Sequence, residues 1–266
     1  VDAAGTVDAV GGGVTDFRPG DRVFTTSDHG EGVDGSYAED LLVSAANLAI
    51  LPDELDLQSA AAVPVAALTA WQALLATDKG ALQAGQSVLV HGASGGLGSF
   101  AVQFAKLWGA RVAGTCSTAN VDYLRGLGTD LALDYGSDDL GAALTGWITD
   151  GLDLIVDAVG GGTLPGALEL LREGGRLVSI ATLVQDGDIT GDAEKARAMG
   201  REKIYAIMDN QTMREDLGEI GAHLAAGDVV MPPVEVFDMA DVRAAHEKIQ
   251  SGHVRGKLVL RIGGEQ

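Results

Sequence analysis

The residues best suited to chemistry form a glycine-rich turn between an apolar run and a helical segment. Residues 87–91 read Ser-Val-Leu-Val-His, and residues 92–98 follow as Gly-Ala-Ser-Gly-Gly-Leu-Gly. Glycines such as Gly95, Gly96 and Gly98 let a backbone turn sharply and approach a ligand closely. A helix that begins there directs unpaired N–H groups and a positive dipole end at that ligand. A pyrophosphate group fits this description.

The same turn satisfies a second motif, G-x-S-x-G, over residues 92–96. This motif is the nucleophile elbow of α/β-hydrolases, in which Ser94 would be the nucleophile and Asp or Glu and then His would follow in the chain. No HGGG-like stretch for an oxyanion hole precedes the turn, whereas Gly98 suits close helix packing in a dinucleotide fold. We therefore favour a cofactor site that includes Ser94 and keep a serine hydrolase as the alternative.

Two other classes of nucleotide-dependent enzyme are disfavoured. A short-chain dehydrogenase needs a catalytic tyrosine with lysine four residues later, and no tyrosine of this chain has that partner. No G-x-x-x-x-G-K-[ST] loop is present either, which argues against a P-loop enzyme.

Residues that could bind metal are few. Cys116 is the single cysteine, which excludes a disulfide framework within the chain and a cysteine cluster for structural zinc. The histidines are scattered without the H-x-x-x-H spacing that places two imidazoles on one helical face. We expect each to be a surface residue or a satisfied structural one. They are His29, His91, His223, His246 and His253.

Composition indicates a globular protein with a sizeable core and more than one domain. The chain has 266 residues, of which 46% are hydrophobic, and a formal net charge of -20. Such a charge repels nucleic-acid phosphates and anionic lipid, so neither partner is expected. The longest apolar run, residues 60–68, is too short to span a bilayer and contains Pro64. We expect a cytoplasmic protein.

From residue 86 onward, short apolar runs alternate with helical segments. The predicted strands are 87–91, 111–115, 131–134, 152–158, 176–180 and 204–208. The predicted helices are 99–108, 120–127, 138–149, 164–172 and 193–201. This alternation predicts an α/β fold with a doubly wound, six-stranded parallel sheet of the Rossmann type.

Both flanks of this region differ from it. Residues 1–51 are rich in turn signals such as Arg18-Pro-Gly-Asp21 and Gly32-Val-Asp-Gly35, which predicts short strands of a β-rich module. After the sheet we expect helices at 213–226 and 239–251 and a strand at 257–262. The predicted domains are a β-rich catalytic domain, residues 1–67 with 213–266, and a dinucleotide-binding domain, residues 68–212, inserted in it.

The end of the second strand bears on the choice of cofactor. An NAD site usually places a carboxylate there to hold the ribose 2′-hydroxyl, but this strand continues as Cys116-Ser-Thr-Ala-Asn120. The missing carboxylate removes a repulsion against a 2′-phosphate, and Ser117 and Asn120 offer neutral hydrogen bonds to it. NADP(H) is favoured, although no Arg or Lys lies in this stretch.

In combination, these features resemble the zinc-independent branch of the medium-chain dehydrogenase/reductase superfamily, the quinone oxidoreductase-like enzymes. The resemblance runs nearly end to end. Its segments are residues 2–5, 10–24, 35–39, 61–71, the glycine turn with Gln103, 133–135, 156–160 and 255–260.

The resemblance implies roles for individual residues. The family uses backbone groups of Gly95, Gly96 and Leu97 for the pyrophosphate and the side chains of Ser117 and Tyr135 for the adenosine phosphate. It places the remaining candidates near the nicotinamide and its ribose or in the cofactor cleft; these are Thr69, Val159, Ile180 and Lys257.

The resemblance also shapes our expectations about metal, chain start and assembly. Zinc-dependent relatives have histidine at the position of Val1 and cysteine near Val65, so catalytic zinc is not expected, and the β-rich domain would be GroES-like. Relatives begin with roughly a further half-domain, so we assign no catalytic residue. We expect an NADPH-dependent reductase of quinones or α,β-unsaturated carbonyls that forms a homodimer. A non-catalytic NADPH-binding protein is a further alternative.

Overall fold

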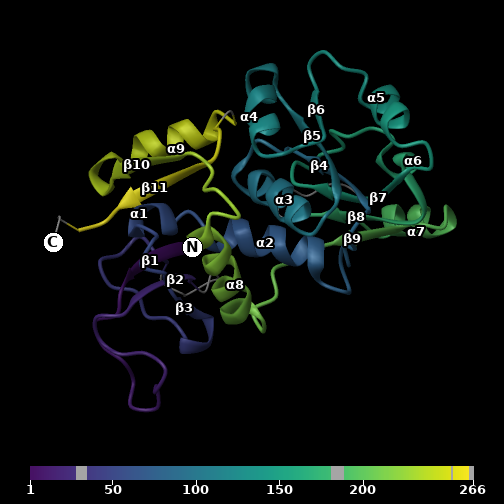
Figure 1. Cartoon of the computed structure of the whole chain (residues 1–266). Helices are drawn as coiled ribbons and strands as arrows, with labels where there is room; N and C mark the ends of the chain where they lie inside the picture. The colour runs from purple at the N-terminus through teal and green to yellow at the C-terminus, as the bar shows by residue number, and fades with distance from the viewer. Residues whose placement is uncertain (28–34, 181–188, 253, 264–266) are drawn as a thin grey trace. The chain divides into compact units, whose positions relative to one another are not determined.

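The chain forms two compact units in the computed structural model (Figure 1). One unit combines Val1–Leu68 with Asp209–Gln266, and the other is Thr69–Met208. Residues 1–27, 35–180, 189–252 and 254–263 are described here. Two of the scattered histidines, His29 and His253, and most of the turn signal at 32–35 lie outside these residues.

The unit formed by residues 69–208 is built on a parallel sheet of six strands. Their order is β6-β5-β4-β7-β8-β9, and every neighbouring pair is parallel. The strands are β4 (Ser87–His91), β5 (Arg111–Cys116), β6 (Leu131–Asp134), β7 (Leu152–Asp157), β8 (Leu171–Ser179) and β9 (Glu202–Tyr205). From β4 the chain adds β5 and β6 on one side of the sheet, and it then returns to add β7, β8 and β9 on the other side. The carboxyl ends of β4 and β7 therefore form the topological switch point, at which such sheets bind ligands.

Helices cover both faces of this sheet, as the predicted doubly wound fold requires. α3 (Gly96–Leu107) and α4 (Val121–Gly126) lie on one side, and α5 (Leu140–Trp147), α6 (Ala167–Leu170) and α7 (Ile189–Ala198) lie on the other (Figure 1). All five residues of β4 are buried, as expected for a central strand covered on both faces. The fold-class prediction is confirmed.

Aromatic side chains fix α2 (Pro64–Leu75) to α3. The Trp71 ring meets Phe104 edge-on at a centroid distance of 5.1 Å and Trp108 at 4.8 Å. Such edge-to-face pairs add to the free energy of burying their apolar area. They stabilise the packing of α2 against α3, the helix that follows the glycine turn.

The other unit is rich in short strands. β1 (Asp2–Thr6), β2 (Arg22–Thr26) and β3 (Leu48–Ile50) form an antiparallel sheet, and β10 (Val234–Asp238) pairs in parallel with β11 (Lys257–Arg261). The helices are α1 (Leu57–Ala60), α8 (Met213–Ala226) and α9 (Val242–Gln250), with single 3-10 turns at Ala45–Asn47 and Met239–Asp241; a third, Thr118–Asn120, lies in the sheet unit. Among the described residues, no helix is both long and apolar enough to cross a bilayer.

Two element predictions are wrong, and one strand was not predicted. The helix predicted at 164–172 is only Ala167–Leu170, because Leu171 already pairs with Leu152 in the sheet. The strand predicted at 204–208 lies earlier, at Glu202–Tyr205, because these residues pair with the last four residues of β8. β10 was not predicted, because its partner β11 lies far along the chain and the local sequence gives no turn that would join them.

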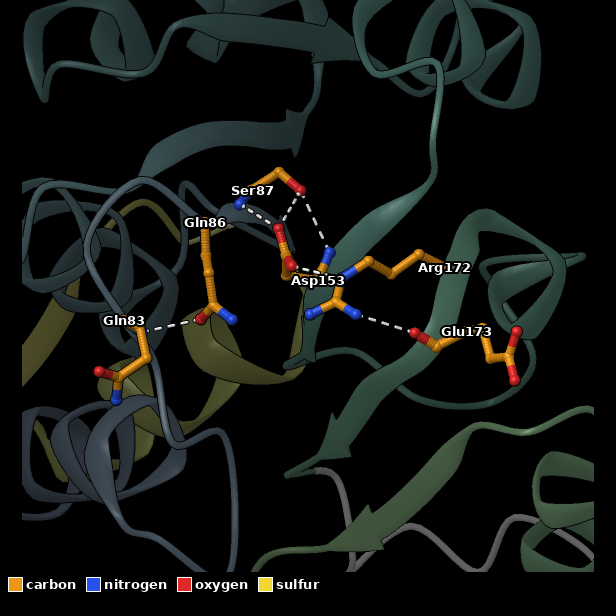
Figure 2. A network of polar contacts seen from close by, with 6 residues as sticks. All are labelled: Gln83, Gln86, Ser87, Asp153, Arg172 and Glu173. Atoms are coloured by element: carbon orange, nitrogen blue, oxygen red, sulfur yellow. Dashed lines mark hydrogen bonds and ion pairs between the residues drawn. The ribbon is translucent and has the colours of Figure 1, made fainter.

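A polar network joins the amino ends of three adjacent strands, β4, β7 and β8 (Figure 2). The Asp153 carboxylate accepts hydrogen bonds from the Ser87 backbone N–H (2.7 Å) and hydroxyl (2.8 Å) and from Arg172 Nε. In return, the Ser87 hydroxyl accepts the Asp153 N–H. This network lies at the opposite end of the strands from the glycine turn, so we assign it to stability.

Candidate functional site

The glycine turn connects β4 to α3 and has the geometry of an anion site. Gly95 is the N-cap of α3, and no side chain caps the helix there. A Cβ on Gly98 would lie 2.2 Å from the Gly92 carbonyl oxygen, so only glycine permits this close packing of turn and helix. A Cβ on Gly95 would meet nothing closer than 3.4 Å, which leaves room beside it. The first N–H groups of a helix have no intrahelical acceptor and can bind an anion.

Three of the predicted site residues lie together beside this turn. The Asn120 amide donates to Ser117 Oγ at 3.0 Å and to Ser94 Oγ at 3.4 Å. Because each serine oxygen accepts from Asn120, each hydroxyl hydrogen can point toward a ligand. The structure therefore brings two hydroxyl donors from the β4 and β5 ends to one place.

A second set of contacts supports the first turn of α3 from α4. The Tyr123 hydroxyl donates to Ser99 Oγ (3.0 Å), which in turn donates to the Gly95 carbonyl (2.7 Å). These bonds fix the carbonyl of the N-cap residue, so Tyr123 and Ser99 position the site through the Gly95 backbone. Sequence analysis did not single out either residue.

At the end of β6, a buried carboxylate already accepts hydrogen bonds from nearby residues. Asp134 accepts from the Thr118 hydroxyl (2.6 Å) and the Gly136 N–H (2.9 Å), and these bonds hold the pKa of Asp134 below its ordinary value. The next residue, Tyr135, donates its N–H to the Cys116 carbonyl, and the residue as a whole is 56% exposed. Tyr135 is therefore available to a ligand at the carboxyl edge of the sheet.

Val159 and Ile180 come together through Asp157 at the end of β7. One Asp157 oxygen accepts the N–H groups of Val159 (3.0 Å) and Gly160 (2.9 Å), and the Asp157 carbonyl accepts the Ile180 N–H (2.9 Å). This turn also touches the glycine turn: Gly92 has φ +80°, and a Cβ there would lie 2.6 Å from a Val159 methyl group. The two predicted cofactor turns thus pack against each other across the switch point.

His91 links the same two turns. One ring nitrogen, Nδ1, lies 2.8 Å from Thr115 Oγ1 and the other, Nε2, 2.9 Å from Thr163 Oγ1. Thr115 Oγ1 accepts the Gly92 N–H (3.0 Å), and the Thr163 hydroxyl donates to the Gly160 carbonyl (2.7 Å). The expectation that His91 is a satisfied structural residue holds, but sequence analysis missed both threonines. The available signal was that His91 and Thr115 lie near the carboxyl ends of adjacent parallel strands.

Thr69 and Lys257 are not part of this cluster. Thr69 is buried in α2, and no described hydrogen bond joins it to the glycine turn. Lys257 belongs to the other unit, in which its ammonium group lies 3.9 Å from Asp2. The Asp2 side chain is 14% exposed, and this partial burial raises its pKa although Lys257 opposes the shift. Asp2 accepts the Val65 N–H at the start of α2.

Cys116 is buried at the end of β5. Burial, together with the nearby Asp134 and Asp138 carboxylates, raises the pKa of its thiol to about 11. A thiol that stays protonated is a poor nucleophile. Cys116 is therefore a packing residue.

Within the described part of residues 69–208, no histidine is placed as a catalytic base for Ser94. His91 is the single histidine in residues 69–208, and both of its ring nitrogens are engaged by threonines. Ser94 Oγ accepts a hydrogen bond from the Asn120 amide. A Ser-His arrangement is the minimum that the hydrolase alternative requires, and the described residues of this unit do not form one.

Comparisons with known proteins now bear on this geometry. Residues 127–260 match the family model described as zinc-binding dehydrogenase, and residues 1–53 match the alcohol dehydrogenase GroES-like domain. The chain is 34% identical to a mitochondrial NAD(P)H oxidoreductase of Danio rerio, over 100% of this chain and 72% of the relative. It is 30% identical to the quinone oxidoreductase of Homo sapiens, over 97% of this chain and 78% of the relative.

The chain belongs to the quinone oxidoreductase-like medium-chain dehydrogenase/reductases. A solved structure, that of the quinone oxidoreductase from Coxiella burnetii, superimposes with a TM-score of 0.85 at 29% identity. The match spans 98% of this chain and 78% of the Coxiella burnetii chain. This quinone oxidoreductase-like protein is accordingly an oxidoreductase with the fold of nicotinamide-dependent enzymes.

The residues of this quinone oxidoreductase-like protein do not suit a catalytic zinc ion. Where zinc-dependent relatives have a histidine ligand it has Val1, and a valine side chain has no donor atom. Those relatives also have a cysteine ligand near the position of Val65, whereas the single cysteine of this chain is Cys116. The Val65 backbone N–H is directed at Asp2. Within the described part of the chain, no group of three or more His, Cys, Asp or Glu side chains is placed to hold a metal ion.

Proposed function

We propose that this protein is an NADPH-dependent, zinc-free reductase that transfers hydride to a quinone or an α,β-unsaturated carbonyl. The observation that carries the choice of cofactor is the cluster of Ser94, Ser117 and Asn120 beside the glycine turn. The names of the human and Coxiella burnetii relatives support a quinone as acceptor. The α,β-unsaturated carbonyl rests on the resemblance of the chain to its family.

The cluster favours a phosphate over a bare ribose. A 2′-hydroxyl is usually held by a carboxylate at the end of the second strand, but β5 ends at Cys116 and is followed by Ser117. The carboxylate at the end of the next strand, Asp134, already accepts bonds from Thr118 and Gly136. Hydroxyl groups that donate to a phosphate form charge-assisted hydrogen bonds, which are stronger than neutral ones.

The other site residues follow the course of a dinucleotide along the carboxyl edge of the sheet. The backbone N–H groups of Gly95, Gly96 and Leu97 hold the pyrophosphate, and the Tyr135 side chain faces the adenosine phosphate. Val159 and Ile180 line the nicotinamide end. We retain Thr69 beside the nicotinamide and Lys257 near the cofactor cleft as parts of this proposal.

The chemistry needs little from the protein beyond orientation and exclusion of water. When bound, NADPH supplies a hydride from C4 of its nicotinamide. Packing of Val159 against Gly92 fixes the turn that receives the nicotinamide end. Without zinc, negative charge that develops on the acceptor oxygen is stabilised by hydrogen-bond donors or removed by a proton from water.

Cofactor titration tests this proposal. We expect NADPH to bind with a saturable change in fluorescence and more tightly than NADH. Ser117→Ala removes one charge-assisted bond and should weaken NADPH binding about tenfold, with NADH changed by less than about twofold. Thr145→Ala is the matched control, because it removes a hydroxyl that bonds to a helix carbonyl on α5. Saturation by NADH alone, or by neither nucleotide, would overturn the proposal.

A panel of acceptors then tests the reaction. Oxidation of NADPH by quinones or by enones, followed at the absorbance of the reduced nicotinamide, is the expected result. Tight NADPH binding without turnover across both acceptor classes would instead support a non-catalytic nucleotide-binding protein.

We also propose that the protein is a cytoplasmic homodimer. Within the described residues, β9 pairs with β8 alone and so leaves one edge of the sheet unpaired, and such an edge is usually covered. Pairing of two copies across a two-fold axis covers it most simply. Sedimentation of a single species with the mass of a monomer at micromolar concentration would contradict the dimer.

A further inference from the structure

Hydrogen-bond directions around His91 define which tautomer its neutral ring adopts. The Gly160 carbonyl can only accept, so the Thr163 hydroxyl hydrogen points to it, and Thr163 Oγ1 must accept from His91 Nε2. The neutral ring then carries its hydrogen on Nε2. Its other nitrogen, Nδ1, accepts the Thr115 hydroxyl hydrogen, while Thr115 Oγ1 accepts the Gly92 N–H. Of the two neutral tautomers, only this one satisfies all four contacts.

The result is one continuous chain of hydrogen bonds with the imidazole at its centre. From Gly92 it runs through Thr115 to Nδ1, and from Nε2 it runs through Thr163 to Gly160. Its two ends are the backbones of the glycine turn and of the turn after β7. Bonds in such chains polarise one another, which makes the set stiffer than isolated pairs.

We propose that His91, as the neutral Nε2–H tautomer, is a positioning residue that fixes the separation of the glycine turn and the Gly160 turn for cofactor binding. The inference rests on the proposed function, because those two turns are the ones assigned to the pyrophosphate and to the nicotinamide end. His91 acts through the two turns, because both of its ring nitrogens are engaged by threonines.

The surroundings of the ring favour its neutral form. His91 is 4% exposed, and burial lowers its pKa, although the charge of Asp157 opposes the shift. Asp157 is aligned with His91 on the neighbouring strand, and one of its oxygens is engaged by the N–H groups of Val159 and Gly160. On the other side, β5 presents Thr115 and then the protonated thiol of Cys116.

Packing alone does not explain the choice of a histidine here. Elsewhere β4 consists of Ser87 and three aliphatic residues, and an aliphatic side chain at position 91 would fill the same strand. Such a side chain would remove the acceptor that the His91 ring provides for the Thr115 hydroxyl. The residue type is accounted for by a ring that can accept at one nitrogen and donate at the other.

Variants of Thr163 test the proposal with little change in volume. Thr163→Val removes the acceptor of Nε2–H and should raise the NADPH dissociation constant about fivefold, whereas Thr163→Ser keeps the hydroxyl and should stay within about twofold of wild type. A purely structural role would lower the melting temperature without this rescue of affinity. His91→Phe should weaken binding further, and if it does not fold, the Thr163 pair still decides the matter.

An imidazole nitrogen-15 spectrum of the full chain provides a second, independent readout. Near neutral pH we expect the pattern of a neutral ring with its hydrogen on Nε2, and we expect Thr163→Val to shift part of the population to the other tautomer. An Nδ1–H ring or an imidazolium in wild type would overturn the inference. So would wild-type affinity in Thr163→Val. If wild type itself fails to bind NADPH, the proposed function fails, which is a distinguishable result.

Discussion

Replacing Asp153 with alanine would test the network at the amino ends of β4, β7 and β8. The change removes an acceptor of three hydrogen bonds and leaves the N–H of the buried Ser87 without its partner. Bonds to a charged group contribute about 1.5 to 3 kcal/mol each, but the Arg172 side chain is 42% exposed and its share is small. We therefore expect Asp153→Ala to lower the free energy of unfolding by about 3 kcal/mol.

The pH dependence of this loss has a defined sign. Burial raises the pKa of Asp153, but the bonds from Ser87 and Arg172 outweigh burial, and the net pKa lies below the ordinary value. A carboxyl group of this kind stabilises the fold above its unfolded-state pKa, about 3.9, and that contribution disappears as the pH falls through the folded-state pKa. The difference between wild type and Asp153→Ala should therefore be constant near neutrality and shrink in acid.

Urea-induced unfolding at several pH values measures this difference. Asp150→Ala is the matched control, because Asp150 is exposed and only three positions away, and it should change stability by less than about 0.5 kcal/mol. Equal stabilities of Asp153→Ala and Asp150→Ala at neutral pH would refute the reasoning. A difference that grows toward acid pH would refute it as well.

Three further predictions concern the glycine turn and the residues around it. Gly98→Ala should destabilise the fold by about 3 kcal/mol, because its Cβ would meet the Gly92 carbonyl oxygen at 2.2 Å, whereas Gly95→Ala should keep the wild-type melting temperature and lose NADPH affinity. Asn120→Asp should weaken NADPH binding at least about tenfold and leave NADH nearly unchanged, since it adds a negative charge beside the phosphate; equal effects in parallel titrations would contradict this. Cys116 should resist a thiol-specific reagent in the native protein at mildly alkaline pH and react fully in denaturant, because burial and neighbouring carboxylates raise its pKa to about 11.

The sheet could be predicted from the sequence where local signals agree. β4 and β6 have the predicted bounds, Ser87–His91 and Leu131–Asp134, because each is a short apolar run bounded by turn residues. The segment at 164–172 failed because its apolar spacing suits a helix, whereas pairing of Leu171 with Leu152 draws the chain into the sheet. That competition depends on a distant strand, which local periodicity does not contain.

The candidate site divides in the same way. The glycine turn and the polar residues after β5 are visible in the sequence, because each follows a recognisable strand. The partners of His91 are not visible there. Thr163, for example, lies 72 positions after His91 and reaches the ring only because β7 pairs with β4. Side chains that act through tertiary contacts leave no spacing pattern to read.

The shared volume of Gly92 and Val159 has a consequence for protein engineering. With the Val159 methyl 2.6 Å from where a Cβ on Gly92 would be, a mutational scan of single positions would score Gly92 as intolerant whatever the merit of the new side chain. Libraries intended to alter nucleotide preference should therefore randomise both codons together, with alanine and glycine allowed at position 159. Asparagine is the first replacement to include at position 92, since it tolerates a left-handed backbone better than other non-glycine residues.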